Sequence, residues 1–585
     1  MLEHVVGRMF QYAARNAQQR NSPPRTDDKG SSPCEESSKL NTAEIEIDNS
    51  PAVLKNIFSL HSDRILCDVC LVVGGKEYPA HRLILCASSE VFRIMLMNPQ
   101  WSECQESRIV LGETPACAEV FDRFLKYFYT GHICVDSQTV MPILTLADKY
   151  NIKDLTNVCQ NYMYDHVQYA ATTNQLVAWH QYTQACGHIK VAKKCQDFIK
   201  WNLQLIAQTP DFGNFEPEIL ISILQQDDIV IVDEMTLLEY VFRWINHQRD
   251  ALFAEAGYIT DEEGVSVCMC DIDIKTLSEV NSQIKDLVCR VITHIRFPMM
   301  SPTQLASLLI QPIVQEFKEF FVQRMAIGMS YHADQKERVE DVCVHDEAGI
   351  SLFTPRLYTS ECWSMLLPLE NYSHLPPYQL RSHVFSSHTA LADHKGHKTC
   401  EWAVDIYPKG VWFQKFYAIV WQGMEEVPEV VLRTVRVSIT CKEPPAEPEG
   451  EMRVKVGILV HGVMDDVEHI MRTVVRTHRF DVDNKVLNLD DVVSFDMLNR
   501  DLASLSRDSN TLFHPPSTST SFTNTGSYSS QQPSPYLVGP YRDILKIHVV
   551  IAPMEQVCSP SLLLRRNLIL SKRSRGRQNK LEKES

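Results

Sequence analysis

The pattern of hydrophobic and polar positions predicts a compact mixed module over residues 51–165. Apolar residues alternate with polar ones over 67–73, as in a half-buried strand. Gly74 and Gly75 follow, and two glycines supply the positive φ angles of a two-residue hairpin turn. Further helices show apolar residues at helical spacing, and one of them ends at Gly131, which is well placed as a left-handed C-cap. These features predict a small sheet packed among helices.

The pattern changes twice further along the chain. Over 166–310, apolar residues recur at i, i+3/4 and i+7, which predicts a helical domain. Within it, Ser301 followed by Pro302 predicts a helix start. Residues 311–345 are expected to form a bridging helix and a linker. Residues 346–556 alternate Val, Ile and aromatic residues with polar ones, which predicts an antiparallel β-sandwich.

Three segments lack this periodicity. Residues 1–50 are rich in Ser, Pro and charge, and we interpret them as a disordered leader. The Ser/Thr-rich stretch at about 502–538 is predicted to be a mobile loop of the sandwich. Residues 557–585 form a basic tail in which 562–580 contains seven Lys or Arg and no acid. We interpret the tail as a solvated terminus, with a nuclear-localisation signal or a weak membrane contact as open alternatives.

Composition limits the classes of function. The net charge of -16 over 585 residues argues against nucleic-acid binding, which needs clustered Lys and Arg, so no nucleic acid is expected as a partner. The 18 cysteines are scattered through apolar runs, which is typical of free thiols in a reducing compartment. A bilayer-spanning helix needs about 18 or more consecutive apolar residues, and we find no such run. We therefore expect a cytoplasmic protein, with the nucleus as the alternative.

The sequence contains no recognisable catalytic or metal-binding motif. It lacks a G-x-S-x-G elbow, a Walker loop and H-E-x-x-H, so neither an enzyme nor a cofactor is expected. Cys67 and Cys70 resemble half of a zinc site, but residues three apart on a strand point to opposite faces and no second pair lies at zinc-finger distance. We interpret them as structural thiols. The "DHKGHK" stretch over 393–398 is interpreted as a polar turn rather than a metal site.

Residues 51–165 resemble the BTB/POZ domain. The resemblance rests on "CDV-LVV---E-PAHR-IL-ASSEVF", "FLKYFYTG" and "LADKYNIKDL". It implies an α/β interaction fold that forms homodimers and has no catalytic site. Asp68 and Arg82 match a charged pair that lies near the dimer interface in that family. The alternative that Asp68 caps a turn and Arg82 packs against a helix stays open.

Two further resemblances complete a multidomain α+β architecture. The long helix carrying Trp244 and the "RFPMMSP" segment over 296–302 make 166–310 similar to the α-helical BACK domain. The "WAVDIYPKGV" stretch, 402–411, makes the C-terminal sandwich similar to TRAF/MATH domains. The order resembles BTB proteins with a TRAF-like sandwich rather than Kelch adaptors, whose period of about 50 residues is not visible.

The BTB resemblance implies a substrate adaptor for a cullin-three RING ubiquitin ligase. A signature of cullin contact in that family is an apolar residue, any residue and then Glu, and Trp101-Ser102-Glu103 stands in that place. The expected partners are cullin three, a second copy of the chain and an unidentified protein substrate. Two alternatives stay open: that Trp101 is a core residue beside a solvated Glu103, and that the chain is a non-ligase BTB scaffold in transcription or trafficking.

Overall fold

The computed structural model describes most of the chain between residues 49 and 557. The described residues are 49–256, 258–260, 266–268, 274–388, 399–410, 434–443, 452–494, 498, 534–555, 557 and 566. The predicted leader up to residue 48, the turn at 393–398, the Ser/Thr-rich stretch up to 533 and nearly all of the basic tail lie outside them. The chain divides into a unit Met1–Ile57 and a unit Phe58–Ser585, and the features below, apart from residues 50–57, belong to the second unit.

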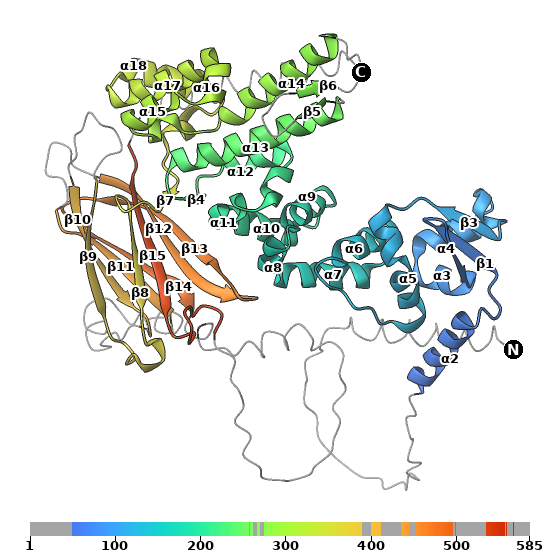
Figure 1. The fold of residues 1–585 in the computed structure, drawn as a ribbon. Coiled ribbons are helices and arrows are strands. Elements are labelled where there is room, and N and C mark those ends of the chain that lie inside the picture. Colours follow the sequence, from blue (N-terminus) through green and yellow to red (C-terminus); the bar gives the residue numbers. More distant parts are fainter. Residues whose placement is uncertain are drawn as a thin grey trace, which may run out of the picture. The chain divides into compact units, whose positions relative to one another are not determined.

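The N-terminal part of this unit combines a three-stranded sheet with helices (Figure 1). The sheet has the order β2-β1-β3, with β2 antiparallel and β3 parallel to β1. Its strands are β1 (Val69–Val73), β2 (Lys76–Ala80) and β3 (Arg108–Leu111). The helices are α2 (Ser50–Ser62), which begins in the first unit, α3 (Arg82–Ser88), α4 (Glu90–Met97), the 3-10 turn η1 (Ser102–Cys104), α5 (Pro115–Thr130), α6 (Val140–Lys149) and α7 (Lys153–Asp165).

The glycines that the sequence singled out have the predicted conformations. Gly74 and Gly75 have φ angles of 56° and 79° in the turn between β1 and β2. Gly131 ends α5 with a φ of 64°. A Cβ atom on Gly74 would also lie 3.0 Å from the Cβ of Ala118, so a side chain at position 74 would be strained and crowded.

The middle of the chain is helical, with one short pair of strands, β5 and β6, and the single short strand β4. Its elements are α8 (Val167–Thr172), α9 (Leu176–Ala185), α10 (Ile189–Trp201), α11 (Leu203–Ala207), η2 (Pro210–Asn214), α12 (Pro217–Leu224), β4 (Val230–Ile231), α13 (Glu234–Glu255), β5 (Tyr258–Thr260), β6 (Ser266–Cys268), α14 (Ile274–Ile292), η3 (Phe297–Met299), α15 (Pro302–Leu308), α16 (Pro312–Glu316), α17 (Lys318–His332), α18 (Lys336–His345) and η4 (Gly349–Phe353). Ser301 caps α15 in a capping box with Gln304, as the Ser-Pro sequence predicted.

The connection after α15 is more helical than the sequence indicated. The predicted single bridging helix is interrupted at Phe317, whose φ and ψ of -107° and 38° separate α16 from α17. The expected linker contains α18. Val339 and Cys343, one helical turn apart, are buried against Tyr331 of α17, and this contact holds α18 in place.

The C-terminal part is an antiparallel sandwich, as predicted. One sheet has the order β14-β11-β10-β9 and the other β13-β12-β15-β8, and their inward-facing residues form one hydrophobic core. The elements are β7 (Leu357–Tyr358), β8 (Ser364–Leu369), η5 (Tyr372–His374), β9 (Arg381–His388), β10 (Thr399–Tyr407), β11 (Thr434–Cys441), β12 (Met452–Met464), β13 (Val467–Phe480), β14 (Val486–Ser494) and β15 (Leu545–Pro553). The Trp402 indole lies in the core and donates to Ser387 Oγ at 2.9 Å.

A parallel strand pair and a buried ion pair join the helical region to the sandwich. β4 pairs with β7 (Figure 1). In this pair Val230 lies beside Leu357. Next to this pair, Arg356 Nε lies 3.1 Å from Glu234 Oε2, and both side chains are fully buried. Tyr358 donates to the same carboxylate at 2.8 Å.

Two more cations complete this buried polar cluster. Arg296 donates from its backbone to Glu234 at 2.9 Å and from Nη2 to Asp227 at 2.6 Å. Lys455 of β12 donates from Nζ to the carbonyl oxygens of Asp227 and Pro355 at 3.1 and 2.6 Å. The cluster therefore links four segments that are far apart in the sequence.

Candidate protein-interaction site

The segment that follows α4 carries the predicted Trp101-Ser102-Glu103 signature. Ser89 caps the start of α4 by accepting from Phe92 N at 3.1 Å. Phe92 and Leu96 are buried, so the opposite face of the helix points outward, where Ile94 is 46% and Met97 65% exposed.

Trp101, which follows α4, is exposed as well. The residue is 49% accessible, which excludes a core role for it within this chain. Trp101 is the N-cap residue of η1, and its backbone carbonyl accepts from Cys104 N at 3.2 Å. The Glu103 carboxylate, two residues further on, accepts from Ser102 Oγ at 3.0 Å. An aromatic ring and an acid thus stand close together in the sequence on one short turn.

Arg82 holds this turn through backbone carbonyl groups. Its guanidinium donates to Cys104 O at 2.9 Å, to Leu96 O at 3.3 Å and to Glu103 O at 3.4 Å. It also donates to Glu106 O. A planar guanidinium with several donors suits such a set of acceptors. Arg82 therefore fixes both ends of the segment that displays Trp101.

Asp68 has a different role within the chain. Its carboxylate accepts from the backbone N–H of Arg82 at 2.7 Å, at the start of α3. Asp68 thus satisfies a free N–H of the first turn, while the Arg82 side chain points to the turn after α4. Both contacts are structural ones within one chain, and a role of the two residues at a dimer interface stays a prediction.

Arg82→Ala is expected to loosen the Trp101 segment without unfolding the module. The substitution leaves several carbonyl groups without a charged donor, and one such bond contributes roughly 1.5–3 kcal/mol. We expect amide hydrogen exchange over residues 98–106 to become at least about tenfold faster. Arg93→Ala, which removes an exposed arginine paired with Glu90 on α4, is the matched control. Equal exchange in the wild type and Arg82→Ala would show that Arg82 does not hold the segment.

Cys67 and Cys70, which resembled half of a zinc site in the sequence, do not belong to a set of metal ligands in the part of the chain that the structure describes. Cys70 is on β1, and Cys67 precedes the strand with its sulfur 3.9 Å from His81 Nε2. Among the described residues, His, Cys, Asp and Glu side chains nowhere gather in threes close enough to hold a metal ion. Within the same described ranges, no helix is both long and apolar enough to cross a lipid bilayer.

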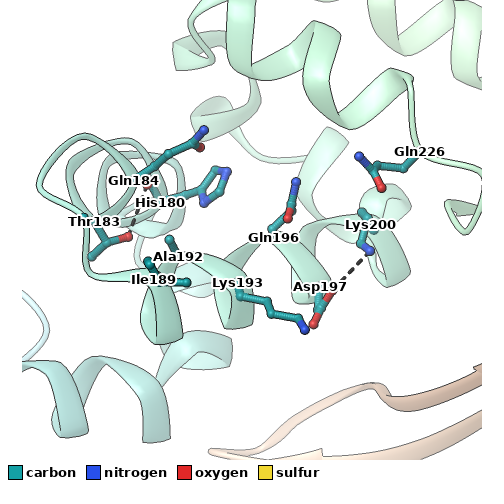
Figure 2. Close-up of a pocket in the computed structure, with 11 residues that line it drawn as sticks. His180, Thr183, Gln184, Ile189, Ala192, Lys193, Gln196, Asp197, Lys200 and Gln226 are labelled. Atoms are coloured by element: carbon teal, nitrogen blue, oxygen red, sulfur yellow. Dashed lines mark hydrogen bonds and ion pairs between the residues drawn. The ribbon is translucent and has the colours of Figure 1, made fainter.

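A polar pocket of about 470 Å³ lies between α9 and α10, and no residue of the Trp101 segment lines it. Figure 2 shows His180 and Gln184 projecting from α9, and Lys193, Gln196 and Lys200 from α10. Burial lowers the pKa of His180, which favours its neutral form. Lys200 is ion-paired with Asp197 and Asp228 at 3.1 and 2.8 Å, so this cation is already neutralised. Lys193 also lines the pocket, so its walls carry lysine and aspartate side chains rather than charge of one sign.

Arg566 of the basic tail contacts the helical region. Arg566 donates to the carbonyl oxygens of Cys343, Asp346 and Glu347 at 2.5, 3.0 and 3.0 Å, at the C-terminal end of α18. A cation is favoured there because the last carbonyl groups of a helix have no partner in the helix. The Arg566 side chain is thus engaged within the chain, whereas the sequence predicted a solvated tail.

Comparison with known proteins identifies three domains. Residues 57–167 match the BTB/POZ domain, residues 176–255 match the family described as BTB And C-terminal Kelch (BACK), and residues 353–555 match the BTBD17 TRAF domain. The Trp101 segment lies in the first of these, and the buried Arg356 lies in the third.

Among curated proteins, the chain is similar to several named BTB/POZ domain-containing protein 17. It is 24% identical to the one from Xenopus laevis over 372 residues, which cover 62% of this chain and 69% of the relative. It is 32% identical to the one from Homo sapiens over 209 residues, which cover 35% of this chain and 42% of the relative. It is also 27% identical to Kelch-like protein 24a from Danio rerio over 200 residues, which cover 34% of this chain and 32% of the relative. The chain therefore contains a BTB/POZ domain, a BACK domain and a TRAF domain of the BTBD17 type, and it is similar to the proteins named BTB/POZ domain-containing protein 17.

Proposed function

We propose that the chain is the substrate-recognition adaptor of a cullin-three RING ubiquitin ligase. BTB-BACK proteins with Kelch-like homologues are commonly adaptors of this kind, and they are typically non-catalytic. In this proposal the BTB/POZ domain binds cullin three, the TRAF domain captures a protein substrate, and ubiquitin transfer is carried out by the RING partner and its conjugating enzyme. We place the complex in the cytoplasm, with the nucleus as the alternative.

The observation that carries the proposal is the exposure of Trp101, which is 49% accessible and follows a helix whose Ile94 and Met97 are exposed too. A buried aromatic residue removes roughly 150–250 Å² from water, which at about 25 cal/mol per Å² gives several kcal/mol before the cost of association. Trp is also enriched among the residues that dominate interface energies. Because Arg82 already fixes the segment, little ordering entropy is left to lose on binding.

Homodimerisation is the second part of the proposal. A BTB dimer, with Asp68 and Arg82 near its interface, would present two cullin sites and two TRAF domains. Two linked weak contacts gain avidity through a high effective concentration of the second site. If the chain sediments as a monomer at micromolar concentration, homodimerisation is contradicted. The proposed contact with cullin three is tested separately by the variants below.

The double substitution Trp101→Ala/Glu103→Ala tests the cullin contact. We expect the affinity for the purified N-terminal domain of cullin three to fall about 30-fold or more, the loss typical of an interface hot spot of about 2 kcal/mol. Binding is measured by calorimetry with the full chain, and light scattering checks that the oligomeric state is unchanged.

Val110→Ala is the matched control, since Val110 is an apolar residue of β3 that is 72% exposed. It should bind cullin three as the wild type does. Equal affinities of the wild type and the double variant would contradict the proposed contact. A wild-type chain that dimerises and does not bind cullin three would favour the non-ligase BTB scaffold instead.

A further inference from the structure

Two cysteines of the TRAF domain lie in sulfur–sulfur contact. Cys400 Sγ on β10 and Cys441 Sγ on β11 are 3.3 Å apart. Cys400 is 2% exposed and Cys441 0%, and both belong to the core of the sandwich. Since a disulfide bond is about 2.05 Å long, the sulfurs need to approach by only about 1.3 Å to reach bonding distance.

The backbone around the pair is held by the sheet. Cys441 lies opposite Trp402, so Cys400 and Cys441 point to the same side of adjacent antiparallel strands, two positions apart in register. Lys442 N donates to Glu401 O at 3.0 Å, and Cys441 N donates to Lys485 O at 2.9 Å. Rotation of the two side chains therefore changes the sulfur distance more readily than movement of the strands.

The pair is also chemically asymmetric. One sulfur of the pair donates to the other, and this hydrogen bond raises the pKa of Cys400 and lowers that of Cys441. The thiolate is the reactive form of a cysteine, and the lowered pKa makes it easier to form at Cys441 than at Cys400. Cys441 ends β11 and Cys400 is the second residue of β10, so both stand at one end of the strand pair, where local opening admits a small reagent.

We propose that Cys400 and Cys441 form a disulfide when hydrogen peroxide oxidises the TRAF domain. The Cys441 thiolate attacks one peroxide oxygen, the O–O bond breaks, and the departing hydroxide takes up a proton to leave as water. The product is a sulfenic acid on Cys441. The Cys400 thiol then attacks that sulfur and forms the S–S bond, and a second water departs with the thiol proton. In total, two thiols and one hydrogen peroxide give one disulfide and two waters.

The bond would convert a hydrogen-bonded strand pair into a covalent one. It closes a loop over a sequence separation of 41 residues, and such a closure constrains mainly the unfolded chain. The TRAF domain would therefore exist in a reduced state and in a more stable oxidised state. This inference does not depend on the adaptor function, because it concerns chemistry inside one domain.

The test is oxidation of the folded full-length chain with hydrogen peroxide, followed by blocking of free thiols and peptide mass spectrometry without reductant. We expect a cross-linked peptide containing Cys400 and Cys441, and its loss after treatment with dithiothreitol. We also expect the melting temperature of the sandwich to rise by roughly 5–15 °C on oxidation.

Cys400→Ala and Cys441→Ala should each abolish both the cross-link and the thermal shift. Cys195→Ala, which removes a buried cysteine of α10, should retain both. A cross-link that forms only after the protein is denatured would overturn the proposal, as would its absence from the folded wild type. Since the mass spectrum is recorded on the wild type, the result does not depend on whether the variants fold.

Discussion

Glu234→Gln is expected to lower the free energy of unfolding by about 3–5 kcal/mol, the cost typical of removing one partner from a buried ion pair. The substitution keeps the shape of the side chain and removes its charge. Arg356, which is fully buried, would then lack an anionic partner, and the hydrogen bond from Tyr358 would lose its charged acceptor. The measurement is the urea-unfolding midpoint followed by tryptophan fluorescence, with the slope checked for a change in cooperativity.

Glu239→Gln is the matched control, because Glu239 is an exposed acid on the same helix. It should stay within about 0.5 kcal/mol of the wild type. The combined variant Glu234→Gln/Arg356→Met should be less destabilised than Glu234→Gln alone, because it also removes the uncompensated charge. A loss below about 1 kcal/mol in Glu234→Gln would show that water reaches the pair and that the cluster is not sealed.

Lys455 is expected to make stability depend on pH in the alkaline range. The pKa of Lys455 is lowered from 10.5 to about 8, chiefly by burial. The positive charges of Arg296 and Arg356 also lower it, whereas the carboxylates of Asp227 and Asp228 raise it and offset part of the change. Between these two values the unfolded chain binds a proton that the folded chain has released. The free energy of unfolding that Lys455 contributes therefore rises as the pH rises through this window.

The effect is isolated by comparing the wild type with Lys455→Met. Relative to the variant, the wild type should gain about 2 kcal/mol between about pH 7 and about pH 9.5. Lys442→Met is the control for removing a lysine from an exposed position on the same sandwich. Parallel curves for the wild type and Lys455→Met would mean that the ammonium group is solvated in the folded protein.

The local elements were predictable because short-range chemistry determines them. The hairpin at Gly74-Gly75, the cap at Ser301 and the left-handed end of α5 at Gly131 each depend on residues a few positions apart, and all three are confirmed. The alternation of apolar and polar residues in the sandwich strands is likewise confirmed. Successive side chains of a strand point to opposite faces, so a strand with one buried face has an apolar residue at every second position. The break at Phe317 was missed, because no Pro or Gly marks it.

The candidate interaction site was predictable in part. The resemblance placed Trp101 and Glu103 after α4, but their exposure depends on how α4 packs, and this follows from Phe92 and Leu96 facing inward. The sequence also paired Arg82 with Asp68. The structure instead directs the Arg82 guanidinium to carbonyl groups 14 to 24 residues away. No residue pattern identifies a backbone carbonyl as a partner, so this contact could not be predicted.

By itself, the sequence determined the order of a mixed α/β module, a helical region and a β-sandwich, since periodicity and turn residues act over neighbouring positions. Only the tertiary structure decided which distant groups meet: Glu234 with Arg356, Lys455 with Asp227 and Pro355, and Cys400 with Cys441. Such contacts join segments separated by 41 to 228 residues. Their energies come from desolvation and charge at close range, and these exist only after the chain has packed.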